Sequence, residues 1–225
     1  MDLSLVWMML LFTSIGVFIV TSVVVAFVRE RRRNEQWQQV AEQLGLSFLG
    51  NDNDLLSRFG EMKLFQRGRN RQFRNAIAGD MGPVRVVLSD FRYTTGSGRN
   101  QKTRHFTVGI VQNDALDVTA CYLRPERRWL DAIGSLFGGQ DIDFEEDDQF
   151  SRRFVLQGES EAEVRELFHA DVRAWFCDNS LPHMQFEARG NTLALHTGKR
   201  FPPDQSAKIL QMALEITKVL GRQPR

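Results

Sequence analysis

The hydrophobic and polar positions divide the chain into a long uncharged apolar segment and a larger part with regularly spaced apolar residues. Residues 3–28 carry no charged side chain, and their few interruptions are Thr, Ser and Gly. As a helix they would extend about 39 Å, which exceeds the roughly 30 Å hydrocarbon core of a bilayer. The pattern predicts a single-pass transmembrane helix that contacts the lipid bilayer through residues 3–28, with some tilt.

Basic residues follow the apolar segment directly: Arg29, Arg31, Arg32 and Arg33. A cleaved signal peptide would have a basic start, a shorter apolar core and a cleavage site of small residues. The segment lacks these features, so we expect a retained anchor. The positive-inside rule then places the arginines in the cytoplasm and the N-terminus outside. We expect residues 1–33 to form the transmembrane anchor with its basic juxtamembrane segment. Residues 34–225 should form a single cytoplasmic domain.

Beyond the anchor, the spacing of apolar residues is first helical and then strand-like. Residues 34–46 have a helical stripe that Gly45 ends, and residues 55–59 predict a short helical turn. Alternating segments rich in β-branched and aromatic residues follow, separated by turn-forming residues. Short connections between consecutive strands indicate an antiparallel meander. The expected strands are residues 62–65, 73–78, 84–93, 105–111 and 118–123.

The C-terminal part mixes helices and strands. Pro125 at an early helical position and the capping box of Ser160 and Glu163 each indicate a helix start, and Gly221 ends the last helix. The fold class is therefore α+β, a meander with packed helices that ends in a β-α-β-β-α unit, within one soluble domain. The expected elements are a helix over 125–137, a strand at 154–156, a helix from 160 to about 176, a hairpin of 184–188 and 192–196, and a helix from about 203.

Net charge and cysteine content limit the classes of function that this chain can have. The 225-residue chain has a formal net charge of +1, but from Asn34 onward it has 25 Lys and Arg against 26 Asp and Glu. A nearly neutral domain argues against nonspecific nucleic-acid binding. Cys121 and Cys177 lie far apart in apolar surroundings and form no CxxC motif. We expect two buried, reduced thiols.

Several short motifs resemble those of a family of uncharacterised bacterial single-pass membrane proteins with one cytoplasmic α+β domain. The resemblance covers nearly the whole chain. It implies a bacterial inner-membrane location, and it implies no activity or site residues. The residues that carry it are Phe91-x-Tyr93-Thr94-Thr95-Gly96-Ser97-Gly98, Arg124-Pro125-Glu126, Gln140-Asp141-Ile142-Asp143-Phe144, Phe150-Ser151-Arg152-Arg153-Phe154 and Val164-Arg165-x-x-Phe168.

Residues 96–103 differ at one position from the phosphate-binding loop G-x-x-x-x-G-K-[ST], because Gln101 replaces its second glycine. That loop also requires a helix after it, so that backbone amides face the phosphates. The residues after Thr103 have the alternation of a strand. We therefore expect the tip of a β-hairpin rather than a nucleotide site, and no cofactor is indicated.

The acidic run 141–148 is a candidate divalent-metal site, because Asp141, Asp143 and Glu145 alternate along it. An EF-hand loop would need glycine at its sixth position and glutamate at its twelfth, where this chain has Glu146 and Arg152. A solvated acidic turn is the simpler interpretation. The alternative is a membrane-anchored, metal-dependent hydrolase that uses these carboxylates.

The segment 63–74 is strongly basic and contains interleaved phenylalanines. It predicts either a surface that binds anionic lipid or nucleic acid, or a solvated stretch whose arginines pair with the acidic run. We favour the internal pairing. The residues concerned are Lys63, Arg67, Arg69, Arg71 and Arg74.

No sequence-local catalytic motif is present. The four histidines form no HxH or HExxH pattern, and there is no GxSxG motif. The sequence therefore favours a membrane-anchored cytoplasmic binding or scaffold domain that recruits a protein partner or self-associates. The hydrolase and the lipid-binding or nucleic-acid-binding module are the alternatives, and nucleic acid is the least favoured partner.

Overall fold

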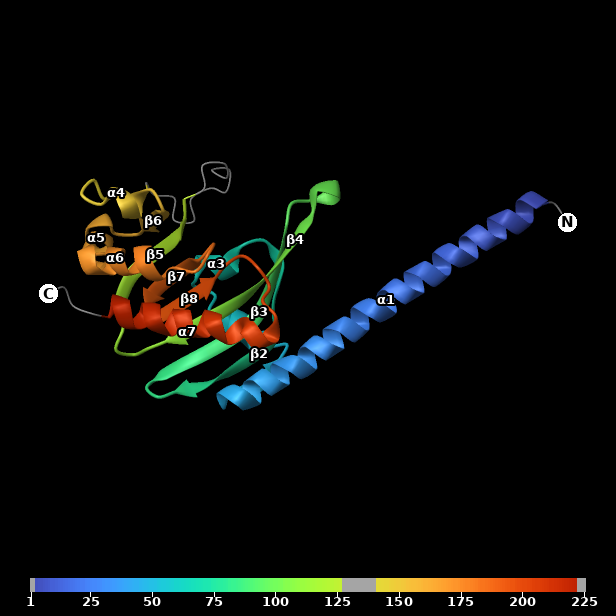
Figure 1. The fold of residues 1–225 in the computed structure, drawn as a ribbon, viewed down its shortest axis with the longest axis horizontal. Helices are drawn as coiled ribbons and strands as arrows, with labels where there is room; N and C mark the ends of the chain where they lie inside the picture. Colours follow the sequence, from blue (N-terminus) through green and yellow to red (C-terminus); the bar gives the residue numbers. More distant parts are fainter. Residues whose placement is uncertain (1–2, 127–140, 222–225) are drawn as a thin grey trace.

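The computed structural model describes residues 3–126 and 141–221. One long helix leads into an eight-stranded antiparallel sheet with helices on both faces (Figure 1). The helices are α1 (Leu3–Leu44), α2 (Asp54–Arg58), α3 (Lys63–Gln66), η1 (Gly98–Asn100), α4 (Asp148–Ser151), α5 (Glu161–Leu167), α6 (Ala170–Asn179) and α7 (Pro203–Leu220). The strands are β1 (Ser47–Gly50), β2 (Arg69–Met81), β3 (Val84–Thr95), β4 (Lys102–Gln112), β5 (Val118–Pro125), β6 (Phe154–Gly158), β7 (Gln185–Gly190) and β8 (Thr192–His196).

The strand order is β1-β2-β3-β4-β8-β7-β5-β6. The predicted meander is confirmed for β2, β3 and β4, but its last step is wrong, because β5 pairs with β6 and β7 instead of β4. The hairpin of β7 and β8 fills the gap between β4 and β5. Every residue of β8 is buried, so this strand is stable only with neighbours on both edges and cover on both faces. The predicted C-terminal unit therefore completes the same sheet as the meander.

Two apolar cores lie on opposite faces of the sheet. The larger core includes Trp37 of α1, Leu88 of β3 and Ile209 of α7. Gly109 lets α7 approach β4 closely, since a Cβ at this position would lie 3.2 Å from Cγ2 of Ile209. The smaller core is formed by α2, α3 and the other face of β2, β3 and β4, and tilted aromatic pairs such as Phe73 with Phe91 dominate it.

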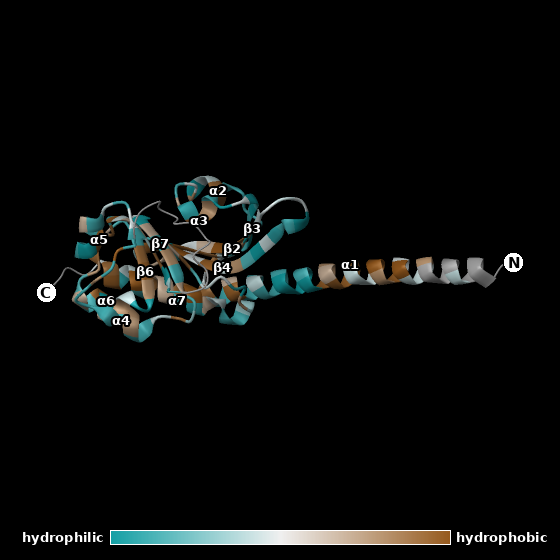
Figure 2. Ribbon diagram, turned by 90° about the horizontal axis from the view of Figure 1, so that it is seen from above, coloured by the Kyte–Doolittle hydropathy of each residue, from teal (hydrophilic) through white to brown (hydrophobic). Residues whose placement is uncertain are grey.

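α1 is a single uninterrupted helix, so the anchor and the predicted helix over 34–46 are one element. The side chains of residues 12–28 are exposed and largely apolar, whereas Trp37 is fully buried in the domain. Figure 2 shows the apolar half of α1 extending away from the domain. It is long and apolar enough to cross a membrane, as the sequence predicted.

Three other local predictions need correction. The strand predicted at 62–65 is the short helix α3, and the short edge strand β1 was not foreseen. The helix that begins after Ser160 is confirmed with its cap, but it ends at Leu167 and the chain restarts as α6. The helix predicted over 125–137 falls mostly outside the described residues, and Pro125, its expected start, is the last residue of β5.

Candidate functional site

The junction between α1 and the sheet is built around a buried ion pair. Arg33 donates two hydrogen bonds to the carboxylate of Asp90, both 2.7 Å long, and a third of 2.7 Å to the backbone oxygen of Phe201. The Asp90 side chain is only 5% exposed and that of Arg33 is 14% exposed. Because both charges are largely withdrawn from water, their geometry fixes the rotation and height of α1 against the sheet.

Asp90 also accepts hydrogen bonds from Thr107 at 3.1 Å, Asn75 at 3.2 Å and Arg200 at 3.1 Å. Burial alone would raise the pKa of Asp90, but the hydrogen bonds and charges of Arg33 and Arg200 outweigh burial and lower it. The carboxylate is therefore ionised at neutral pH. It links strands β2, β3 and β4 and the segment before α7 to the helix.

A second, more exposed layer of the junction surrounds Glu30, one turn closer to the apolar segment. Glu30 pairs with Arg74 of β2 at 3.5 Å and with Arg200 at 3.2 Å. The guanidinium of Arg33 lies 5.9 Å from the ring centroid of the buried Trp37. Charged and apolar contacts therefore alternate where α1 joins the domain. A flexible linker is absent between the described residues 28 and 44, because α1 is continuous there.

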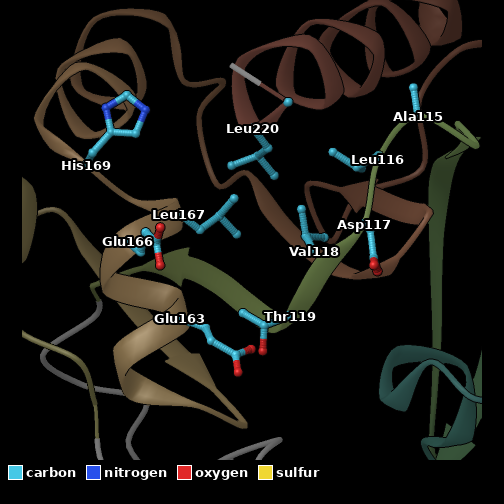
Figure 3. Close-up of a pocket in the computed structure, with 11 residues that line it drawn as sticks. Ala115, Leu116, Asp117, Val118, Thr119, Glu163, Glu166, Leu167, His169 and Leu220 are labelled. Atoms are coloured by element: carbon cyan, nitrogen blue, oxygen red, sulfur yellow. The ribbon is translucent and has the colours of Figure 1, made fainter. Parts of the chain in front are cut away.

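A groove lies at the end of the domain opposite the anchor, between β5, α5 and the C-terminal end of α7 (Figures 1 and 3). Its volume is about 380 Å³. Apolar side chains and carboxylates both line it, the latter on α5 and on the segment that leads into β5. The main lining residues are Leu116, Asp117, Val118, Glu163, Glu166 and Leu220.

The groove is electrostatically negative. Among the ion pairs of the described residues, none involves Asp117, Glu163 or Glu166, and no Lys or Arg lines the groove there. Nε2 of His169, which also lines it, is buried without a hydrogen-bond partner. Apolar lining beside unpaired carboxylates suits a ligand that carries positive charge next to an apolar group.

The acidic run is an extended segment along the edge of β6, where the Ile142 amide donates to the Leu156 oxygen at 2.8 Å. Ile142 and Phe144 point into the core, so Asp141, Asp143 and Glu145 alternate outward and are exposed. Within residues 3–126 and 141–221, no three His, Cys, Asp or Glu side chains cluster closely enough to hold a metal ion. A metal site at these three carboxylates stays a prediction that this geometry does not favour.

Two arginines pair with the acidic run, Arg152 with Asp148 and Arg173 of α6 with two other carboxylates. Arg173 pairs with Asp147 at 2.9 Å and with Glu146 at 3.2 Å, and its guanidinium lies 4.2 Å from the centroid of the Phe144 ring. The hydrogen bond from Arg173 lowers the pKa of Asp147. The favoured pairing of the acidic run with residues 63–74 does not appear among these contacts.

The residues of the basic stretch contact different parts of the domain. Arg74 pairs with Glu30 in the junction. Arg71 donates to the Phe65 oxygen, and Arg69 donates to the backbone oxygen of Gly96 at 2.6 Å, beside the β3–β4 turn. Arg67 is half-buried, as is Lys63 at the start of α3. The five predicted residues therefore do not form one patch.

Glu187 explains why residues 62–65 are not a strand. Its carboxylate accepts hydrogen bonds from the amides of Lys63 at 2.8 Å and Leu64 at 2.7 Å, which fixes the first turn of α3. Burial raises the pKa of Glu187, although these amides partly oppose the shift. The predicted site residues do not include Glu187 or Asp90. The sequence does contain a sign of their role, because each is a lone acidic residue within an apolar strand pattern.

No family model matches the chain, and no curated protein matches it. The fold is similar to the crystal structure of the mycobacterial trehalose monomycolate transport factor A, TtfA, with a TM-score of 0.53. The match covers 85% of this chain and 93% of that chain at 13% sequence identity. At this identity the likeness shows a shared fold alone. The family resemblance inferred from the sequence stays a prediction.

Proposed function

We propose that this chain is a membrane-anchored scaffold that holds a partner-binding domain at a fixed distance from the bilayer. The observation that carries the proposal is the buried pair of Arg33 with Asp90, which joins the continuous helix α1 rigidly to the sheet. An enzyme that needs only membrane proximity would function on a flexible tether. A rigid tether fits a domain that must meet another membrane protein at a defined height and angle.

The proposed orientation follows the positive-inside rule, with the N-terminus outside and the domain in the cytoplasm, at the inner membrane of a bacterium. Arg29 and Arg32 remain exposed next to the apolar segment, so they support this orientation even though Arg33 is engaged in the junction. We propose that the boundary between anchor (1–33) and domain (34–225) lies inside the single helix α1 and separates membrane attachment from partner binding.

The proposed binding site is the negative groove. A partner segment that fits it has Lys or Arg residues flanking an apolar side chain, since Leu116, Val118 and Leu220 offer apolar contact beside Glu163 and Glu166. The solved neighbour is named a transport factor. A role in assisting a membrane transport protein suits a rigidly held, partner-binding domain, and we propose it for this chain as well.

The test is site-specific photo-crosslinking in native membranes. A photoreactive amino acid replaces Thr119, which lines the groove, and a second version carries it at Gln43, an exposed position on α1. We expect Thr119 to capture a membrane protein that Gln43 does not capture, through a peptide with the predicted basic and apolar residues.

The matched control changes charge inside and outside the groove. Glu163→Lys with Glu166→Lys should abolish the capture, whereas Asp171→Lys, at an exposed carboxylate of α6, should leave it unchanged. Capture of identical proteins from Thr119 and Gln43, or capture that survives the Glu163 and Glu166 changes, would rule out the groove as the binding site.

A further inference from the structure

The β3–β4 hairpin extends beyond the junction to the same side of the domain as the apolar part of α1. Figures 1 and 2 both show the hairpin tip and the N-terminal part of α1 leaving the domain in this direction. The first residues of β2 lie beside the hairpin, since Arg69 pairs in register with Thr94. We call residues 69–74 of β2 together with residues 92–105 the basic arm.

The basic arm has a large excess of positive charge at its end. From Phe91 to Asn113 the sequence contains no Asp or Glu. Arg99, Lys102 and Arg104 are exposed, and none of them takes part in an ion pair of the described residues. Arg69 binds only neutral oxygens, of Gly96 and Gln101, so its charge adds to theirs.

Burial is the main cause of the lowered pKa of His105 on the arm, and the positive potential adds to it. Its pKa is lowered by partial burial and then by the charges of Arg200, Arg92 and Arg74, with Asp90 as the opposing carboxylate. The three arginine charges that disfavour a further positive charge here also attract anions. The arm is therefore an anion-attracting surface next to a membrane helix.

The arm is long enough to reach the membrane surface. Thr95 lies five residues beyond Asp90, which corresponds to about 17 Å along a strand. Val28, the last residue of the apolar segment, lies five residues from Arg33, or about 8 Å along the helix. Because Arg33 and Asp90 are in direct contact and both elements run to the same side, the arm reaches at least as far as the start of the apolar segment.

We propose that the basic arm binds the anionic phospholipid headgroups of the leaflet in which α1 is anchored. Arg29 and Arg32 contact this leaflet at the helix, and Arg99, Lys102 and Arg104 form a second contact point away from it. Because α1 and the domain are joined rigidly, two separated contacts restrict the tilt of both together relative to the bilayer and their joint rotation about the helix axis. Each basic residue near an anionic surface strengthens binding roughly five-fold, so the three tip residues together contribute on the order of a hundred-fold.

Lipid is favoured over nucleic acid because the anchor already holds the arm at the bilayer surface. The arm also exposes no phenylalanine, tyrosine or tryptophan ring fully for single-stranded bases to stack on, since Phe73 is buried and Tyr93 is half-buried against Phe91 and Phe106.

The test uses the full chain in lipid nanodiscs with a bimane fluorophore on Ser97→Cys at the hairpin tip. Cys121 and Cys177 are buried, and the unmutated chain serves as the labelling blank. Replacing part of the phosphatidylcholine with phosphatidylglycerol should reduce quenching of bimane by acrylamide about two-fold, and high salt should reverse the reduction. A label on Ala162→Cys of α5, at the far end of the domain, should show no change.

Charge reversal identifies the responsible residues. Arg99→Glu with Lys102→Glu and Arg104→Glu should abolish the effect of phosphatidylglycerol, whereas Arg85→Glu with Lys218→Glu, at exposed positions outside the arm, should not. Equal quenching in both lipid compositions overturns the proposal. Protection by an added single-stranded RNA, but not by anionic lipid, also overturns it and assigns the arm to nucleic acid.

Discussion

The buried pair of Arg33 and Asp90 makes a sharp prediction about stability. In Asp90→Asn, the guanidinium of Arg33 loses its counter-charge while it remains largely buried. Removing one partner of a buried pair costs about 3–5 kcal/mol, a large part of the 5–15 kcal/mol by which domains are stable. For a domain of this size the melting temperature should fall by roughly 6–20 °C.

The measurement is thermal unfolding of the full chain in detergent, followed by near-ultraviolet circular dichroism. The pKa of Asp90 is lowered in the folded state, so its contribution is present above the unfolded value of about 3.9 and is lost as the pH falls through the folded pKa. The difference between Asp90→Asn and the unmutated chain should therefore be constant near neutral pH and shrink only below about pH 4.

A double variant separates charge burial from packing. Arg33→Met with Asp90→Leu removes both charges and keeps apolar volume, so it should be much closer in stability to the unmutated chain than Asp90→Leu alone. A melting temperature for Asp90→Asn within 2 °C of the unmutated chain would refute the reasoning. So would a double variant whose loss equals the sum of the single losses.

Three further changes test other parts of the fold. Because the pKa of Glu187 is raised, its stability contribution is complete below its ordinary value of 4.5 and is lost as pH rises through the folded pKa; unfolding of Glu187→Gln across pH 4–8 should lack this decline. Gly68→Ala places a Cβ 2.4 Å from the Thr94 oxygen, so urea unfolding should show a loss of about 1–3 kcal/mol, and a smaller one for Gly82→Ala, where nothing lies within 4 Å. Burial raises the pKa of Cys121 to about 12, so N-ethylmaleimide should modify Cys121 in urea but not in the native chain.

The sequence predicted those features that depend on local pattern. The uncharged run 3–28, the hairpin tip after Thr95 and the cap at Ser160 were each recognisable from a few neighbouring residues. Strand pairing was harder, because adjacency along the chain favoured β4 beside β5. The insertion of β7 and β8 between them depends on the burial of β8 on both faces, which only the assembled sheet shows.

The candidate site was predictable only in part for the same reason. The basic stretch and the acidic run were recognised as charged segments, but their partners, Glu30 for Arg74 and Arg173 for Asp147, lie far away in sequence. The groove brings together β5, α5 and α7, and no local spacing indicates such a site. Long-range contacts of this kind have no signature in one sequence.

The domain is nearly neutral overall, but its positive and negative side chains are concentrated in different segments. Residues 62–113 contain ten Lys and Arg against two Asp, while residues 141–179 contain twelve Asp and Glu against four Arg. The basic half includes the arm on the anchor side, and the acidic half includes the groove at the opposite end (Figure 1). An anionic leaflet would attract the first half and repel the second, so its field would hold the groove facing away from the bilayer. Because the junction transmits this orientation to α1 without a flexible linker, weakening either the arm or the Asp90 contact should disturb partner capture at the groove without any change to the groove itself.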